Sequence, residues 1–153
     1  MKLRAARVPE ADELTELCLR SKAVWGYDAA FMAACRDELA MTPAKIETSS
    51  VEVAELDGRL AGVARLVFDD GTAELAALFV EPDMQGSGVG RALFDWAAAE
   101  CSARRVAIMV IEADPGAAPF YRRMGARDAG TVPSGSIPGR LLPRLEYALA
   151  RAG

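Results

Sequence analysis

The chain has 153 residues, of which 52% are hydrophobic and 26% are charged. A chain of this length commonly folds as one domain, and folding then buries roughly 70% of the surface that the unfolded chain exposes. The 18 basic and 22 acidic residues give a net charge of −4, which disfavours binding to nucleic-acid phosphates. We therefore expect one ordered domain over residues 1–153 and no nucleic-acid partner.

The absence of histidine from the sequence excludes Ser-His-Asp catalysis, Cys-His catalysis and His-ligated metal sites. The three cysteines, at positions 18, 35 and 101, include no C-x-x-C pair, so the sequence predicts neither a disulfide framework nor a metal site. No apolar run is typical of a secretion signal or approaches the ~20 residues of a membrane helix. We expect a reduced, cytoplasmic protein with no metal and no membrane contact.

The first third of the chain is predicted to be mainly helical. Residues 2–7 favour a short strand, and a helix is expected from Pro9 to about residue 22. A Trp-Gly-Tyr segment at 25–27 interrupts the helical pattern. Asp28 can cap a second helix that extends to about residue 39, and Pro43 helps to close this region.

The hydrophobic period then changes to the alternation that is typical of strands. Strands are predicted over residues 51–56, 60–68 and 72–80. Asp-Gly pairs at 57–58 and 70–71 separate them, and such pairs favour tight hairpin turns. The three strands are therefore expected to be antiparallel neighbours.

Helices and strands alternate in the remaining part of the chain. We predict a helix over residues 88–103, a strand over 106–111 and a helix over 117–124. Residues 131–143 are rich in Pro, Gly and Ser and are predicted to form a loop, and 145–149 a last strand. This order of elements predicts a single α/β (α+β) domain with a mixed sheet.

A glycine-rich segment lies between the third hairpin strand and the helix that follows it. Backbone N–H groups at a helix N-terminus bind anions, and glycines let a ligand approach the backbone closely. No Lys follows, as a P-loop requires, and the glycine spacing differs from that of the dinucleotide fingerprint. A glycine-rich turn that binds no ligand is the alternative. The segment reads Gln85-Gly86-Ser87-Gly88-Val89-Gly90-Arg91.

This segment resembles a motif of the GNAT superfamily of N-acetyltransferases. Gln85-x-x-Gly88-x-Gly90 matches the family's Gln/Arg-x-x-Gly-x-Gly/Ala pattern. The clear resemblance spans residues 72–127 and implies a mixed, mostly antiparallel sheet with splayed central strands, flanked by helices. The match also includes Leu78-Phe79-Val80-x-Pro82, Asp114-Pro115 and Phe120-Tyr121-x-x-Met124-Gly125-Ala126.

The resemblance implies that acetyl-CoA is the co-substrate. Amide groups of the glycine-rich segment would bind the CoA pyrophosphate, and the strand before it would pair with the pantetheine arm. Tyr121 would donate a proton to the departing thiolate, and its alternative role is that of a packing aromatic. The cofactor-binding residues expected from the resemblance are Leu78, Phe79, Val80, Gln85, Gly86, Ser87, Gly88, Val89, Gly90, Arg91 and Asp114.

Acetyl transfer also requires that the attacking amine be neutral, and no histidine is available as the base. Glu74 and Glu81, on the third hairpin strand and at its end, are the candidates. A Glu is a weak base unless burial raises its pKa. A chain of water molecules is the alternative base, and an exposed strand carboxylate is the alternative reading of Glu74.

The acceptor site is expected near the segment that joins the first two helices. Trp25 and Tyr27 are candidates to line an amine pocket, with a hydrophobic anchor as the alternative. Arg140, in the loop before the last strand, would suit a carboxylate on the acceptor. The predicted function is direct acetyl transfer, in a ternary complex, to a primary amine of a small molecule or peptide. The alternative is a CoA-binding sensor or interaction module without turnover. A homodimer is compatible with both functions.

Overall fold

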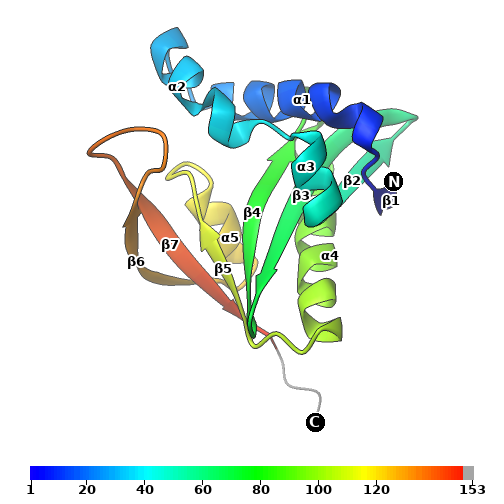
Figure 1. Ribbon diagram of the computed structural model, residues 1–153, viewed down its shortest axis with the longest axis vertical. Coiled ribbons are helices and arrows are strands. Elements are labelled where there is room, and N and C mark those ends of the chain that lie inside the picture. Colours follow the sequence, from blue (N-terminus) through cyan, green and yellow to red (C-terminus); the bar gives the residue numbers. More distant parts are fainter. Residues whose placement is uncertain (150–153) are drawn as a thin grey trace.

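The structure is a computed structural model that describes residues 1–149. Its strands form one seven-stranded sheet in the order β1-β2-β3-β4-β5-β7-β6, with helices on both faces (Figure 1). In chain order the elements are β1 (Lys2–Ala5), η1 (Val8–Glu10), α1 (Ala11–Ala23), α2 (Ala29–Leu39), α3 (Pro43–Thr48), β2 (Ser50–Leu56), β3 (Arg59–Asp69), β4 (Thr72–Val80), η2 (Pro82–Met84), α4 (Val89–Ala103), β5 (Ile108–Glu112), α5 (Ala118–Arg123), β6 (Arg127–Pro133) and β7 (Leu141–Ala148).

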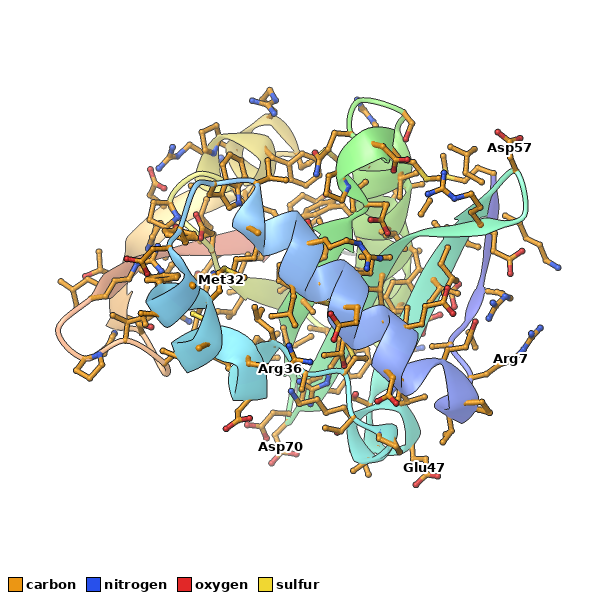
Figure 2. The ribbon with its side chains drawn as sticks, turned by 90° about the horizontal axis from the view of Figure 1, so that it is seen from above. Arg7, Met32, Arg36, Glu47, Asp57 and Asp70 are labelled. Atoms are coloured by element: carbon orange, nitrogen blue, oxygen red, sulfur yellow. The ribbon has the colours of Figure 1, made fainter. Side chains whose placement is uncertain are left out.

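Two tight turns build the antiparallel half of the sheet. Asp57 and Gly58 have φ angles of +52° and +77°, the left-handed pair that matches the twist of a two-residue hairpin turn. The turn at Asp70 and Gly71 joins β3 to β4 with only Gly71, at φ +79°, in the left-handed region. Asp57 and Asp70 both lie at the periphery of the molecule (Figure 2). Strands β1 to β4 are antiparallel neighbours, so both predicted hairpins are confirmed.

The centre of the sheet opens where its one parallel pair of strands ends. Strands β4 and β5 pair in register only from Thr72–Ile108 to Glu74–Val110. Beyond Glu74, β4 continues along β3 as far as Val80, whereas β5 follows β7. The two central strands therefore diverge, as predicted, and the sheet is mixed and mostly antiparallel.

Successive side chains of a strand point to opposite faces, so each face of this sheet has its own core. Helix α1 contributes Leu14 and Leu17 to one core, where they pack with Val53 of β2. On the opposite face Leu93 and Phe94 of α4 are fully buried in the larger core. Burying a Leu or Phe side chain stabilises the fold by roughly 1.5–3 kcal/mol, so α4 is held firmly at its position.

The structure differs from the sequence-based expectation at two places. The segment 131–143 is not one loop, because β6 extends to Pro133 and β7 begins at Leu141. Val132 pairs with Leu142, and β6 lies at the edge of the sheet, where a strand tolerates proline. The short helix α3 was also not predicted; Thr42 caps it, and Pro43 occupies its first turn.

The predicted domain runs to residue 153, and its last four residues lie outside the described part of the chain. Within residues 1–149, none of the helices has both the length and the apolar character needed to cross a membrane.

Candidate functional site

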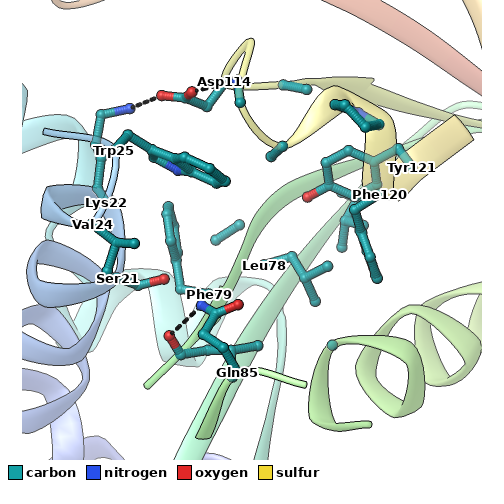
Figure 3. A pocket seen from close by; sticks show the side chains of 18 of the residues that line it. Ser21, Lys22, Val24, Trp25, Leu78, Phe79, Gln85, Asp114, Phe120 and Tyr121 are labelled. Carbon is teal, nitrogen blue, oxygen red and sulfur yellow. Dashed lines mark hydrogen bonds and ion pairs between the residues drawn. The ribbon is translucent and has the colours of Figure 1, made fainter. Parts of the chain in front are cut away.

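A cavity of about 540 Å³ opens between the diverging strands. Its walls are the second half of β4, the end of β5 with the following turn, the start of α4, the helix α5 and the connection between α1 and α2 (Figure 3). This volume is within the usual range of small-molecule sites, roughly 300–1,000 Å³. The divergence of β4 and β5 is therefore what creates the candidate site.

The glycine-rich segment forms one end of the cavity. Helix α4 begins directly after Gly88, whose φ of +89° is in the left-handed region that favours glycine. The first N–H groups of an α-helix have no intrahelical acceptor, so at α4 they are available to an anionic ligand. Gln85 Nε2 donates to the carbonyl oxygen of Val80 at 3.4 Å and ties the segment to the end of β4 (Figure 3).

The predicted cofactor residues of this segment divide into two groups. Five of them line the cavity. Ser87 and Val89 do not, because the Ser87 hydroxyl donates to the carbonyl oxygen of Met84 and the Val89 side chain is buried in the core. The five lining residues are Gln85, Gly86, Gly88, Gly90 and Arg91.

Strand β4 forms a second wall, and the predicted residues Leu78, Phe79 and Val80 all line the cavity. On one edge these residues pair with β3, where Phe79 lies opposite Val63. Within residues 1–149 no strand pairs with the other edge of β4 beyond Glu74. Apart from the Val80 carbonyl oxygen, which accepts from Gln85, backbone donors and acceptors on that edge are therefore available to a ligand.

Tyr121, on α5, forms part of the cavity wall. Figure 3 shows its hydroxyl oxygen turned toward the open space, whereas the ring is buried, with the residue 6% exposed. The ring packs against Phe120 and Phe94, with centroids 5.2 and 6.3 Å away. Burial raises the pKa of Tyr121, so the hydroxyl is protonated at neutral pH.

The two carboxylates proposed as bases have different surroundings. Glu81 is engaged in an ion pair with Arg20, with N–O distances of 2.7 and 2.8 Å, and does not line the cavity. Glu74 lies in the last β4–β5 pair before the strands diverge, next to the cavity rather than on its wall. Glu74 is exposed on its strand, as the alternative reading expected. Desolvation by nearby protein groups and the negative charge of Glu112 nevertheless raise the pKa of Glu74, and the positive charge of Arg65 opposes the shift.

Glu112 is a wall residue that the sequence analysis did not select. It is the last residue of β5, it is exposed, and it faces the cavity. The only sequence signal for it is a charged residue directly after a predicted apolar strand.

Four predicted residues meet at the far end of the cavity from the glycine-rich segment. Trp25 lines this end and is 49% exposed. Tyr27 does not line the cavity; its hydroxyl donates to Asp114 at 2.7 Å and accepts from Arg140 at 2.6 Å. Asp114 lines the cavity, but its carboxylate is bound by neighbouring side chains, including Lys22 at 3.2 Å (Figure 3). Arg140 already has a carboxylate partner in Asp114, at 3.6 Å.

Comparison with known families identifies the fold. The chain matches the family model of the acetyltransferase (GNAT) domain over residues 14–132. No curated protein sequence matches the chain.

Many solved structures share the fold. The PaiA N-acetyltransferase from Thermoplasma acidophilum, in complex with coenzyme A, superposes with a TM-score of 0.81 at 17% identity, covering 96% of this chain and 98% of that one. The yncA protein from Salmonella typhimurium, with its cofactor acetyl-CoA, has a TM-score of 0.72 and 23% identity over 100% of this chain and 96% of its own. The ribosomal-protein-S18-alanine N-acetyltransferase from Escherichia coli has a TM-score of 0.72 and 19% identity over 99% and 96%.

Among the described residues, no group of three or more His, Cys, Asp or Glu side chains is arranged to hold a metal ion.

The family match covers most of the chain, and the splayed sheet and the glycine-rich start of α4 agree with it. The protein belongs to the GNAT family of acetyltransferases.

Proposed function

We propose that the protein transfers an acetyl group from acetyl-CoA to a primary amine. The observation that carries this proposal is the cavity between β4 and β5, closed at one end by the helix N-terminus of α4. Two solved structures of the same fold contain coenzyme A or acetyl-CoA. The alternative, a CoA-binding module without turnover, is one outcome of the experiment below.

The donor set of the cavity suits a long ligand with a diphosphate at one end. The N–H groups of Gln85, Gly86, Gly88, Gly90 and Arg91 would bind the pyrophosphate, because they lie at the positive end of the helix dipole. Of these, the Gln85 N–H also donates to the carbonyl oxygen of Pro82, at 3.5 Å. The free edge of β4 at Leu78–Val80 would accept and donate hydrogen bonds along the pantetheine arm. Acetyl-CoA supplies the acetyl group as a thioester.

We propose that Tyr121 stabilises the sulfur as the bond between the acetyl carbon and the sulfur breaks. Its hydroxyl faces the cavity, and it would donate a hydrogen bond, and finally a proton, to the thiolate. The raised pKa of Tyr121 makes early, complete proton transfer unfavourable. The hydrogen bond therefore contributes most when negative charge on the sulfur is greatest.

The proton of the attacking amine would leave toward the carboxylates at the fork of the strands. Glu112 lines the cavity, and Glu74 is close enough for its pKa to be raised by the charge of Glu112. A raised pKa makes Glu74 a better base at neutral pH. We propose that Glu112 attracts the amine and that the proton passes through water to Glu74.

Direct transfer in a ternary complex is favoured over an acetylated enzyme. All three cysteines are buried. Burial raises the pKa of Cys18 to about 12 and that of Cys101 to about 11, so neither supplies a thiolate at neutral pH. Intact-mass analysis after incubation with acetyl-CoA alone should show no added acetyl group. Buried free thiols also fit the reducing, cytoplasmic setting that we propose for the protein.

Acetyl-CoA binding is the first test, measured as a thermal shift. At a ligand concentration a hundredfold above Kd the stabilisation should be about 2.7 kcal/mol, and NAD or ATP should give no such shift. Gly88→Glu should abolish the shift, because its carboxylate would repel the pyrophosphate. Gly58→Glu is the matched control: residue 58 also has a positive φ and open space around it, but it lies in the β2–β3 turn. Equal shifts with all three nucleotides, or an unaffected Gly88→Glu, would contradict the proposal.

Turnover is tested by thiol release from acetyl-CoA with a panel of amines. The panel contains cadaverine, L-alanine and an alanine-initiated hexapeptide, because small molecules and a ribosomal-protein alanine are both credible acceptors within this fold. Amine-dependent thiol release supports the transferase. A thermal shift with no release from any primary amine would favour the binding module.

A further inference from the structure

Asp114 is the centre of a hydrogen-bonding network beside the cavity. Its Oδ2 atom accepts from the Tyr27 hydroxyl at 2.7 Å and from Lys22 Nζ at 3.2 Å, and Arg140 Nη2 lies 3.6 Å away. Its Oδ1 atom accepts from the N–H of Gly116 at 2.9 Å. Both oxygens are therefore occupied by groups of the protein itself.

These contacts join segments that are distant in the sequence. Lys22 is near the end of α1, Tyr27 lies in the α1–α2 connection, and Arg140 ends the loop between β6 and β7. The Arg140 guanidinium also lies over the Phe31 ring of α2, 4.8 Å from its centroid. Asp114, in the turn after β5, thus links the α1–α2 connection to the β6–β7 loop.

Trp25 is the residue that this network surrounds. Lys22 and Tyr27, which precede and follow it in the chain, both bind Asp114, and the indole ring packs against Gly116. Figure 3 shows the Lys22–Asp114 ion pair beside the indole, with the ring facing the open space. The network therefore fixes the chain on both sides of Trp25, at Lys22 and Tyr27. It also fixes Gly116, against which the indole ring packs.

The charged side chains of this network are largely shielded from solvent. The side chains of Asp114, Lys22 and Arg140 are only 11%, 12% and 19% exposed. Burial would raise the pKa of Asp114, but the hydrogen bonds from Tyr27 and Gly116 and the charge of Lys22 outweigh it and lower the pKa. Asp114 is therefore ionised at neutral pH, and removal of its charge would leave two poorly hydrated cations without their partner.

We propose that Asp114 is a positioning residue that fixes Trp25 over the amine-binding end of the cavity, and that it does not bind the cofactor. The proposal rests on the proposed function in one respect, because it takes this end of the cavity to be where the amine enters. A second contact, between Ser136 and Glu38 of α2, brings the same β6–β7 loop against the helices. Loss of Asp114 should therefore disturb the amine site while the glycine-rich segment keeps its geometry.

The test uses Trp25 as its own reporter. The chain has two tryptophans, so Trp96→Phe leaves Trp25 as the sole emitter. In this background we expect Asp114→Asn to raise the acrylamide quenching constant of Trp25 at least twofold and to speed hydrogen exchange in residues 134–140. Asp128→Asn is the matched control, because Asp128 pairs with Arg122 at 3.1 Å on the exposed surface and should leave both readings unchanged.

Binding and kinetics separate positioning from cofactor binding. Asp114→Asn should change the Kd for acetyl-CoA less than threefold by calorimetry. It should raise KM at least tenfold, with kcat within threefold, for whichever of cadaverine, L-alanine or the alanine-initiated hexapeptide is acetylated fastest. A tenfold weaker Kd with unchanged Trp25 quenching would overturn the proposal and make Asp114 a cofactor ligand.

Two further outcomes are distinguishable. If Asp114→Asn does not fold, Tyr27→Phe removes two hydrogen bonds of the network, to Asp114 and from Arg140, and should shift the same readings in the same direction; unchanged readings would overturn the proposal. If the unmodified protein binds no acetyl-CoA, the proposed function fails, and quenching and hydrogen exchange still decide whether Asp114 holds Trp25.

Discussion

The indole ring of Trp25 lies so close to Gly116 that a Cβ atom at position 116 would stand 2.7 Å from the indole Cε3. The backbone of Gly116 is outside the left-handed region, so its conformation suits any residue. Glycine is therefore required here by the neighbouring ring and not by the chain conformation.

Gly116→Ala should displace Trp25 with little loss of stability. The ring is half exposed and can move into solvent, so we expect the free energy of unfolding to fall by less than about 1 kcal/mol. The emission of Trp25 should shift to the red, and kcat/KM for the amine should fall. In a Trp25→Ala background the substitution should have no further effect on kcat/KM; a full effect there would show that the ring is not the cause.

Gly62→Ala should destabilise the fold by crowding α4 against the sheet. A Cβ on Gly62 would lie 2.7 Å from Val89 Cγ1 and 3.0 Å from the carbonyl oxygen of Phe79. A β-branched side chain in a helix has little rotamer freedom, so the strain should reduce the free energy of unfolding by roughly 1–3 kcal/mol. Urea unfolding measures the change.

Gly90→Ala is the matched comparison for Gly62→Ala. A Cβ on Gly90 would meet Phe120 at an ordinary 3.5 Å, in the first turn of α4. Alanine there should raise the free energy of unfolding by up to about 1 kcal/mol through helix propensity. If Gly62→Ala were as stable as Gly90→Ala, the close packing of α4 on β3 would be wrong.

Tyr121→Phe should lower kcat more than it raises the KM for acetyl-CoA. In the proposed mechanism the hydroxyl acts only as the sulfur gains charge, so its loss should affect the transition state more than the ground state. Because the pKa of Tyr121 is raised, we expect a loss near the lower end of the ~10²–10⁴ range of general acid catalysis, or below it. Tyr147→Phe, a ring that packs on Phe94 outside the cavity, should retain kcat. Full kcat in Tyr121→Phe, where chemistry limits the rate, would make Tyr121 a packing residue.

Glu74→Gln should increase thermal stability at pH 7 and not at pH 4. The pKa of Glu74 is raised in the folded protein, so folding favours the protonated form, and that contribution is lost as pH rises through the folded-state pKa. Glutamine stays neutral at every pH, so the difference in Tm should disappear below the ordinary Glu pKa of about 4.3. Glu47→Gln, on the exposed surface of α3 (Figure 2), is the control and should change Tm little at either pH. A larger Tm gain at pH 4 than at pH 7 would contradict the assignment.

Local signals allowed much of this fold to be predicted. The Asp57-Gly58 and Asp70-Gly71 turns specify their hairpins within a few residues, and the glycines before α4 identify the candidate ligand site from one continuous segment. β6 and the start of β7 were missed because β6 contains a glycine and a proline and the start of β7 another proline, residues that are depleted in strands, and because their pairing with each other cannot be read from local sequence.

The side-chain partners could not be predicted, because they are distant in the chain. Arg20 and Glu81 are 61 residues apart, and Tyr27 and Arg140 are 113 apart. Nothing in the sequence indicated that Asp114 would bind Lys22 and Tyr27, so its place among cofactor ligands was inferred from the family motif alone. Specific pairs of this kind follow from the assembled fold.

The divergence of β4 and β5 gives the sheet an edge in its interior. Strand edges at the rim of a sheet are templates for the strands of other chains and therefore promote aggregation. Here the unpaired edge of β4 is reached through a cavity walled by α5 and by Trp25, so a second polypeptide would have to displace both before it could pair. A slender ligand with alternating donors and acceptors meets no such obstacle. The fold thus keeps the hydrogen-bonding capacity of an edge strand and reserves it for small molecules.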